Sequence, residues 1–465
     1  MSAPSQRRGA CPALTAPMRT GDGLLVRLNP VAAGLAPDTL VGLCEAASRH
    51  GNGVMEVTAR GSIQIRGLTE ESAPLLAGDA DALGIVARTG VPVETSPLAG
   101  LDPDETADPR PLAEAIRVAI ENAGLSARLG PKVSVIVDGG GRIGMDDLLA
   151  DVRLAAVRRD GETLWHMGIG GTAATARPLG PFAEAQARGA VLAALEAIAA
   201  LGHEGRGRDI AVGRPPTPDP SPQGGGGPGR GSFPSPLWGG VRGGGARWSP
   251  VSSLAIFPLA NATHALGIAL PFGSMPAQKL AELAQAAIEC GAAEIRPAPG
   301  RMLLTMGLTA DSAKTLQKKA VALGFVTKAA DPRLSIAACP GKPACASGHI
   351  ETRAIAEQAA RQNPGLLDGS LTLHVSGCAK GCAHPAAAAL TLVGGENGAG
   401  LVADGTAKTL PAGYASGYDA ADGIGRVAAL VRAARRPDET AAACLARLGA
   451  ATIATAFAQN RRARG

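Results

Sequence analysis

Four of the eight cysteines in this 465-residue chain stand in two close pairs. Five residues separate Cys339 from Cys345, and three residues separate Cys378 from Cys382. Structural zinc sites favour gaps of about two to four residues, whereas four thiolates on glycine-rich loops suit an iron–sulfur cube. The spacing alone therefore favours an iron–sulfur cluster, with a zinc site or unligated thiols as the alternatives.

The other cysteines are scattered along the chain. Cys44, Cys290 and Cys444 stand among alanines and leucines in expected helices, where a buried structural thiol is the simpler interpretation. The N-terminus lacks the apolar run of an export signal, and no stretch approaches the roughly 18 uninterrupted apolar residues of a membrane span. We expect a cytoplasmic protein outside the membrane, with reduced thiols.

The charge distribution does not favour a nucleic-acid partner. The formal net charge is +5, and the segment 213–252 supplies +3 of it from four arginines and one aspartate. Binding of nucleic acid calls for clustered Lys and Arg with stacking aromatics, and aromatic residues are 2% of the chain. The same segment holds 12 glycines and 9 prolines, so we predict a disordered linker between two halves.

The two halves share a pattern of strand, helix, hairpin and helix. The expected elements lie at 23–28, 38–48, 55–68 and 69–83 in the first copy, and at 266–270, 278–287, 293–308 and 310–323 in the second. The hairpins turn at Arg60-Gly61 and Pro299-Gly300, where glycine tolerates the required backbone angles. We expect two related half-domains packed as one pseudo-symmetric body.

A different segment with an α/β pattern follows each copy. Helices are predicted at 112–125, 181–201, 422–435 and 439–459, and strands at 133–138, 152–158, 163–169, 371–375 and 388–392. The predicted domains are a half-domain at 15–95, a middle α/β domain at 96–212, the linker at 213–252, a second half-domain at 253–330 and a cysteine domain at 331–465.

The half-domains, the α/β domains and the two cysteine pairs together resemble the siroheme-dependent sulfite and nitrite reductases, over nearly the whole chain outside the linker. The resemblance implies an α+β fold of duplicated ferredoxin-like half-domains plus two α/β domains, the second carrying a 4Fe-4S cluster. It implies that the cluster ligands are Cys339, Cys345, Cys378 and Cys382. The last of these, Cys382, would face the tetrapyrrole pocket.

The same resemblance implies a set of basic pocket residues. Arg27 and Arg60 match arginines that bind macrocycle carboxylates, and Lys132 matches the first of two lysines used for a small anionic substrate. Arg27 and Lys132 would thus be the catalytic residues. Ser134 stands where the second lysine is expected, and the segment 96–103 lacks the expected Arg-Asn motif. Loss of this charge makes the site poorly suited to sulfite reduction.

Four motifs are more similar to the precorrin-3B synthases, a family related to these reductases. They are Ser96-Pro-Leu-Ala-Gly-Leu-Asp-Pro, Val137-Asp-Gly-Gly-Gly, Trp165-His-Met-Gly-Ile-Gly-Gly and His374-Val-Ser-Gly-Cys-Ala-Lys-Gly-Cys-Ala-His-Pro. This resemblance implies that the pocket holds the substrate precorrin-3A, which dioxygen hydroxylates at C-20 with closure of a lactone. It also implies a non-haem iron besides the cluster, and electrons from NADH through a reductase or ferredoxin-like protein. A siroheme-containing sulfite or nitrite reductase and a non-catalytic cluster carrier are the alternatives.

Several polar residues near these motifs remain to be assigned. Lys380 and His384 lie beside the cluster cysteines and are candidates for substrate contact. His166, His374 and His384 are candidate ligands of a second iron, although no His-x-Asp/Glu pattern nominates a ligand triad.

Three arginines of the half-domains call for separate interpretations. Arg66 and Arg301 lie on the polar sides of their hairpins, where we expect solvated side chains. Arg27 interrupts an apolar strand, and because a buried arginine is costly unless paired, we expect it to have a functional partner.

Overall fold

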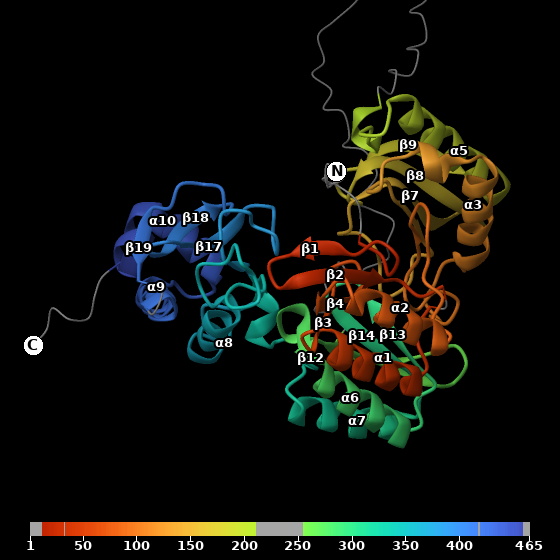
Figure 1. Cartoon of the computed structure of the whole chain (residues 1–465). Coiled ribbons are helices and arrows are strands. Elements are labelled where there is room, and N and C mark those ends of the chain that lie inside the picture. Colours follow the sequence, from red (N-terminus) through yellow and green to blue (C-terminus); the bar gives the residue numbers. More distant parts are fainter. Residues whose placement is uncertain (1–11, 32, 211–253, 417–418, 459–465) are drawn as a thin grey trace, which may run out of the picture. The chain divides into compact units, whose positions relative to one another are not determined.

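The structure is a computed structural model, shown in Figure 1, that describes residues 12–31, 33–210, 254–416 and 419–458. The predicted linker lies outside the described residues. The chain divides into two compact units. Unit 1 comprises residues 1–10 and 89–249, and unit 2 comprises residues 11–88 and 250–465. Both half-domains and the cysteine domain therefore belong to unit 2.

The first half-domain of unit 2 contains a five-stranded sheet in the order β1-β2-β4-β3-β12. Its elements are β1 (Met18–Thr20), β2 (Gly23–Leu28), α1 (Pro37–His50), β3 (Val54–Val57), β4 (Ile63–Leu68), α2 (Ser72–Ala82) and β12 (Ser274–Pro276). Apolar residues alternate with polar ones along β3 and β4, so Val57, Ile63 and Ile65 are buried while Glu56 and Gln64 share the opposite face. The hairpin prediction is confirmed.

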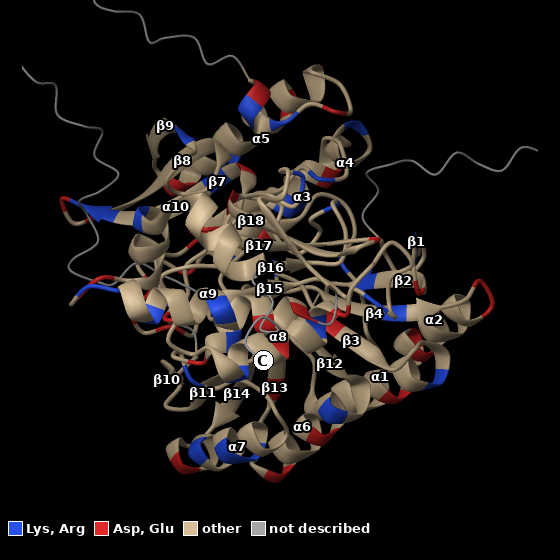
Figure 2. Ribbon diagram, turned by 90° about the vertical axis from the view of Figure 1, so that its left-hand side faces the viewer, with Lys and Arg blue, Asp and Glu red and all other residues tan. Residues whose placement is uncertain are grey.

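The second half-domain repeats this pattern with a four-stranded sheet in the order β10-β11-β14-β13. Its elements are β10 (Ile256–Pro258), β11 (His264–Ala269), the 3-10 helix η3 (Pro271–Gly273), α6 (Ala277–Glu289), β13 (Glu294–Ala298), β14 (Met302–Leu308) and α7 (Ala310–Ala322). Both acidic and basic residues lie along α6 and α7 (Figure 2), where they form the ion pairs Lys279–Glu282 and Lys314–Asp311. Neither helix presents a surface of one charge sign.

Each half-domain completes the sheet edge of the other. Strand β12, which follows β11 along the chain, pairs with β3 through Met275 and Met55. In the reciprocal position Leu35, which follows β2, exchanges two backbone hydrogen bonds of 2.9 and 2.8 Å with Ile295 on β13. Helices α1 and α6 start directly after these segments and pack together in one shared hydrophobic core. The expected pseudo-symmetric body is thus one folding unit.

The cysteine domain contains a five-stranded sheet in the order β15-β16-β17-β18-β19, in which the first three strands are parallel. Its elements are η4 (Pro332–Ser335), β15 (Ile336–Ala338), α8 (Thr352–Gln362), β16 (Leu373–Ser376), β17 (Ala388–Gly395), β18 (Gly398–Gly405), β19 (Gly413–Ala415), α9 (Ala420–Ala434) and α10 (Ala441–Ala458). Strand β18 runs antiparallel to both of its neighbours, β17 and β19.

Unit 1 contains a sheet in the order β5-β6-β7-β8-β9, again with three parallel strands followed by two antiparallel pairings. Its elements are β5 (Val93–Glu94), α3 (Arg110–Asn122), α4 (Leu125–Arg128), β6 (Val135–Asp138), β7 (Ala150–Arg159), β8 (Glu162–Gly171), β9 (Arg177–Phe182), α5 (Glu184–Ala200) and η1 (Gly207–Asp209). The two α/β segments that follow the half-domains therefore share one topology. The strand order reveals this second repeat, which sequence similarity does not show.

Among the helices that the structure describes, α10 alone is long and apolar enough to cross a membrane by length and composition. A core helix meets the same criteria, and α10 packs against β18, β19 and α9 with Cys444, Leu445 and Phe457 buried. Gly449 interrupts the helix with a φ of 77°. We therefore interpret α10 as a core helix of this domain.

Candidate functional site

The two cysteine pairs follow neighbouring parallel strands of the cysteine domain. Cys339 comes directly after β15 and Cys378 comes shortly after β16, so both loops lie at the same edge of the sheet. The backbone N–H of Cys339 donates to the carbonyl oxygen of Val375 at 3.2 Å. Cys339 is buried, Cys345 and Cys378 are half-buried, and Cys382 is exposed. The last cysteine is thus the one open to a ligand.

The four thiols share one electrostatic environment. Burial raises the pKa of the Cys382 thiol, and the thiols of Cys339, Cys378 and Cys345 raise it further. Within the described ranges no three His, Cys, Asp or Glu side chains lie close enough to hold a single metal ion. Four thiolates are donors both for iron–sulfur clusters and for structural zinc, so the donor types by themselves fit either group.

Three glycines line the cysteine loops where the chain passes closely over itself. A Cβ atom on Gly377 would lie 3.2 Å from the Cα atoms of Gly341 and Gly348 and 3.5 Å from Sγ of Cys339. The backbone N–H of Gly377 donates to that sulfur at 3.1 Å. Gly341 has a φ of +60°, which side chains other than glycine rarely adopt. The glycines thus leave room for backbone donors around the sulfurs.

Side chains also hold the two loops in place. The hydroxyl of Thr352, the first residue of α8, donates to the carbonyl oxygen of Cys339 at 2.5 Å. Lys380 lies between Cys378 and Cys382, and its Nζ donates to Oγ of Ser347 in the other loop at 2.9 Å. Its charge also opposes the rise in the pKa of Cys382. Lys380 therefore stabilises negative charge at the exposed cysteine.

The first half-domain contacts the first cysteine loop directly. Gly21, in the turn between β1 and β2, lies against the backbone of Cys345 and Ala346, and a Cβ atom there would meet the nitrogen of Ala346 at 2.1 Å. The next residue, Asp22, accepts two hydrogen bonds from the guanidinium of Arg66 at 2.7 and 2.9 Å. The expectation that Arg66 is solvated was wrong, because only 8% of its side chain is exposed.

The carboxylate of Glu56 connects several of these groups. It accepts hydrogen bonds from Arg353 on α8 at 2.6 Å, from Gln64 at 2.9 Å and from Arg66 at 3.4 Å. The amide oxygen of Gln64 in turn accepts two hydrogen bonds from Arg27, at 2.7 and 3.1 Å. Gln64 therefore orients the guanidinium of Arg27, and the functional partner expected for this arginine stays a prediction.

The two hairpin tips of the half-domains meet. The backbone N–H of Gly300 donates to the carbonyl oxygen of Ala59 at 3.0 Å, and Gly61 lies against the backbone of Ala298. Arg60 is half-buried at the tip of the first hairpin, and Arg301 follows the turn of the second. The pseudo-symmetry thus brings one arginine from each copy to the joint.

Arg301 is not the solvated residue that we expected. Burial lowers the pKa of its guanidinium, and the charge of Glu56 opposes this effect. Its Nη2 donates to the carbonyl oxygen of Ala383 at 3.1 Å, next to Cys382. The sequence gives only a weak signal for this contact. The alternation of polar and apolar residues predicts the hairpin, but it does not reveal that the tip of the second hairpin reaches the cysteine loop.

His384 and His374 lie side by side near this contact. Their ring centroids are 5.7 Å apart with the rings at 65° to each other. His384 is half-buried, whereas His374 on β16 is fully buried. The structure thus brings together the cysteines, Lys380, His384 and His374, and adds Arg301, which was not among the candidates of the sequence.

The remaining candidates belong to unit 1. Lys132 is exposed just before β6, and its carbonyl oxygen accepts a hydrogen bond from Arg206 at 3.1 Å. Ser134 is buried, with its backbone N–H bonded to Asp151 at 3.0 Å. His166 lies half-exposed on β8. The roles of Lys132 and His166 stay predictions.

The scattered cysteines are placed largely as expected. Cys44 and Cys444 are buried, and burial raises the pKa of the Cys44 thiol to about 12. Cys290 is only partly buried. Buried thiols with raised pKa are inert, which agrees with a structural role.

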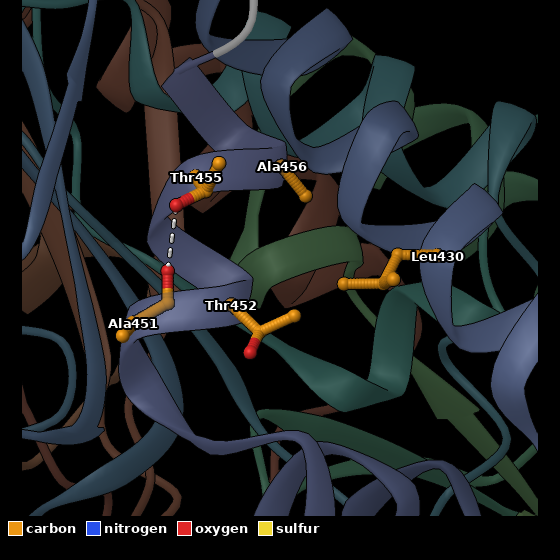
Figure 3. A pocket seen from close by; sticks show the side chains of 5 residues that line it. All are labelled: Leu430, Ala451, Thr452, Thr455 and Ala456. Carbon is orange, nitrogen blue, oxygen red and sulfur yellow. Dashed lines mark hydrogen bonds between the residues drawn. The ribbon is translucent and has the colours of Figure 1, made fainter.

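A surface hollow of about 440 Å³ lies between α9 and α10. Figure 3 shows that alkyl and hydroxyl side chains line it, from Leu430, Ala451, Thr452, Thr455 and Ala456. None of these residues titrates or binds metals strongly. The hollow therefore offers no chemistry comparable to that of the cysteine loops.

Comparison with known proteins identifies the family. Residues 16–83 match the family model described as "Nitrite/Sulfite reductase ferredoxin-like half domain". A curated protein named "Precorrin-3B synthase", from Sinorhizobium sp, is 40% identical over 459 residues, which cover 98% of this chain and 95% of that protein. The chain belongs to the precorrin-3B synthase family. Its members and the reductases share the half-domain that the repeat analysis found.

Two more distant relatives agree with this membership. A ferredoxin–nitrite reductase of Synechococcus elongatus is 23% identical over 399 residues, covering 80% of this chain and 76% of that protein. The structure of Mycobacterium tuberculosis NirA superimposes with a TM-score of 0.65 at 18% identity, covering 92% of this chain and 84% of that one. The second similarity confirms the predicted fold class. The precorrin-3B synthase family is thus favoured over the reductases by the higher identity and coverage.

Proposed function

We propose that this protein hydroxylates precorrin-3A at C-20, with closure of a lactone from the ring A acetate, as a step of cobalamin biosynthesis. The observation that carries the proposal is the 40% identity to a precorrin-3B synthase over 98% of the chain. The four cysteine donors and the basic residues of unit 2 support it, because the substrate is a macrocycle rich in carboxylates. A cytoplasmic location would keep the four thiols reduced.

A 4Fe-4S cluster bound by Cys339, Cys345, Cys378 and Cys382 would supply single electrons. In the overall reaction one oxygen atom of dioxygen enters the macrocycle and the other leaves as water, which consumes two electrons and two protons. We propose NADH as the source of the electrons, through a separate reductase or a ferredoxin-like protein.

The chain's own residues bind and orient the substrate. Arg27, oriented by Gln64, and Arg60, at the hairpin tip, bind carboxylates of the macrocycle. Lys380 and His384 flank the exposed Cys382 and bind the part of the substrate nearest to it. Lys132, which lies in unit 1, is proposed separately, from the resemblance of its motif, as a residue that stabilises charge developing during the reaction.

A separate non-haem iron has less support. In the part of the chain that the structure describes, no group of three His, Cys, Asp or Glu side chains is arranged to hold one metal ion. His374 and His384 are neighbours, but Arg301 places a positive charge beside them, which disfavours a bound cation. We therefore assign no step to such an iron.

The test is turnover of precorrin-3A by the full chain, purified without oxygen and with its cluster intact. With a chemical reductant and ¹⁸O-labelled dioxygen, the product is expected to gain one labelled oxygen atom. Unlabelled product, or no product from cluster-containing protein, would contradict the proposal. A siroheme absorption band in the purified protein together with sulfite or nitrite reduction would assign the alternative reductase function instead.

A further inference from the structure

Beside the second cysteine loop, a buried histidine has unused hydrogen-bonding capacity. His374 has an exposed fraction of 0%, and neither its Nδ1 nor its Nε2 has a hydrogen-bond partner among the residues that the structure describes. Buried polar groups are nearly always paired, because an unsatisfied one loses its hydration without compensation. This imidazole therefore calls for a partner that the described chain does not supply.

Arg301 reaches the same place from the second half-domain. It has a φ of +65°, a conformation that residues with side chains rarely adopt, and its side chain passes over Gly273, where a Cβ atom would lie 2.4 Å from Cδ of Arg301. This conformation brings Nη2 to the carbonyl oxygen of Ala383. A carbonyl dipole does not neutralise a guanidinium, so the positive charge remains for a ligand.

The carboxylate whose charge acts on Arg301 already accepts hydrogen bonds from other side chains. Glu56 is the acidic group whose charge acts on the Arg301 guanidinium. Its two oxygens accept hydrogen bonds from Arg353, Gln64 and Arg66. Within the described ranges Arg301 forms no ion pair of its own, in contrast to Arg66 with Asp22. Glu56 therefore does not supply the missing counter-charge.

His384 completes the group. Its ring lies edge-on to that of His374. Gly381 lies beside this pair, since a Cβ atom on Gly381 would be 3.7 Å from Cε1 of His374. Burial and the charges of His384 and Arg301 lower the pKa of His374 to about 4, so this imidazole is neutral near pH 7 and keeps one N–H donor. Arg301, His374 and His384 thus come from three different segments and lie close together near Cys382.

We propose that Arg301, His374 and His384 form an anion subsite that binds one carboxylate of the macrocyclic substrate beside Cys382. A carboxylate there accepts hydrogen bonds from the guanidinium and from the N–H group of His374, which satisfies the buried ring and compensates the guanidinium charge, while Nε2 of the adjacent His384 donates to the carbonyl oxygen of Ala387 at 3.4 Å. This inference rests on the proposed function for the identity of the ligand. It adds to Arg27 and Arg60 a binding residue from the second half-domain.

The test measures binding rather than turnover. Uroporphyrin III, a carboxylate-rich porphyrin, is titrated into the cluster-containing full chain, and its fluorescence gives the dissociation constant. Arg301→Gln is expected to weaken binding about tenfold or more, since hydrogen bonds between charged groups are among the stronger ones. The matched control is Arg296→Gln in the same hairpin, whose guanidinium pairs with Glu294 at 2.8 Å. The control is expected to bind within about twofold of the unchanged protein.

A second pair of variants keeps the test decisive. His374→Phe retains the ring and removes both nitrogens, and is expected to weaken binding severalfold. If Arg301→Gln does not retain its iron and sulfide, Arg301→Lys replaces it, because lysine keeps the charge but loses the planar fork. Unchanged binding in these variants, or no binding of uroporphyrin by the unchanged protein, would overturn the subsite.

Two further outcomes distinguish an error in the identity of the ligand from an error in the proposed function. Calorimetric titration with sodium sulfite tests a small inorganic anion, and loss of sulfite binding in Arg301→Gln with unchanged porphyrin binding would overturn the carboxylate assignment. If the unchanged protein fails to convert precorrin-3A while Arg301→Gln still weakens porphyrin binding, the proposed function fails and the carboxylate subsite stands.

Discussion

Glu56 on β3 and Arg353 on α8 form an ion pair of 2.6 Å that joins the first half-domain to the cysteine domain. The residue before Arg353 is Thr352, whose hydroxyl holds the carbonyl oxygen of Cys339. The carboxylate that orients Gln64, and through it Arg27, is therefore also bound to the helix behind the first cysteine loop. Gln64 with Arg27 and the first cysteine loop therefore share one structural support.

Glu56→Gln is expected to destabilise unit 2. The side chain of Glu56 is only 12% exposed, and its loss of charge leaves Arg66 and Arg353 without their shared counter-ion. Breaking such a buried network costs about 2–4 kcal/mol of the free energy of unfolding. Urea unfolding measures this loss. The control Glu282→Gln removes an exposed pair with Lys279 and is expected to cost less than about 1 kcal/mol; equal losses in both variants would refute the shared support.

Gly377→Ala is expected to reduce the iron and sulfide content of the purified protein severalfold. The new methyl group would meet the Cα atoms of Gly341 and Gly348 at 3.2 Å and the sulfur of Cys339 at 3.5 Å, so the two loops would have to separate. Gly78→Ala is the control, because nothing lies within 4 Å of its Cβ position on α2. This control is expected to keep its cluster and to gain up to about 1 kcal/mol of stability. Full cluster content in Gly377→Ala would show that the loops tolerate the separation.

Lys380→Met is expected to lower the reduction potential of the cluster. Lys380 is the cation that stabilises negative charge at Cys382, and reduction adds negative charge to the cluster. Because the side chain is exposed, the loss is worth about 1 kcal/mol or less, or roughly 10–40 mV for one electron. Redox titration followed by EPR measures the shift, with Lys314→Met on α7 as the control for net charge. A potential equal to that of the control would argue against this role.

Glu105→Gln is expected to change how the stability of unit 1 depends on pH. Burial, together with the charges of Asp108, Asp102 and Asp138, raises the pKa of this carboxyl to about 7, against the opposing effect of the N–H of Gly100. Since the folded-state pKa lies above the unfolded value of 4.5, unit 1 loses stability as the pH rises from about 4.5 through 7.

The glutamine variant removes this penalty. It is expected to be more stable than the unchanged protein by about 1–3 kcal/mol at pH 8 and to differ little near pH 4.5. Fluorescence of the buried Trp165 reports unfolding of unit 1 once Trp238 and Trp248 are replaced by phenylalanine. A stability difference that is the same at both pH values would show that Glu105 titrates normally.

Local patterns in the sequence were sufficient for much of the secondary structure, whereas the cysteine ligand set stays a prediction. The alternation of Val57, Ile63 and Ile65 predicted the hairpin, and the glycine at position 61 predicted its turn, because both are properties of neighbouring residues. The cysteine spacing and the residues around it indicated an iron–sulfur cluster for the same reason.

Contacts between distant segments decided the rest. Arg66 and Arg301 both follow a polar pattern that predicts solvation, yet Arg66 is buried against Asp22 and Arg301 reaches Ala383. The partner of Arg66 is 44 residues away and that of Arg301 is 82 residues away. Periodicity describes which face of a strand a side chain occupies, but not what packs on that face.

The sequence by itself determined the repeated elements, the four cysteines and the basic candidates, since spacing and composition act locally. Only the tertiary structure decided that both α/β segments share one topology, that the half-domains exchange edge strands, and that His374, His384 and Arg301 meet beside Cys382. These outcomes depend on burial and hydrogen bonding between residues far apart in the chain, which only the packed sheets bring within reach of one another.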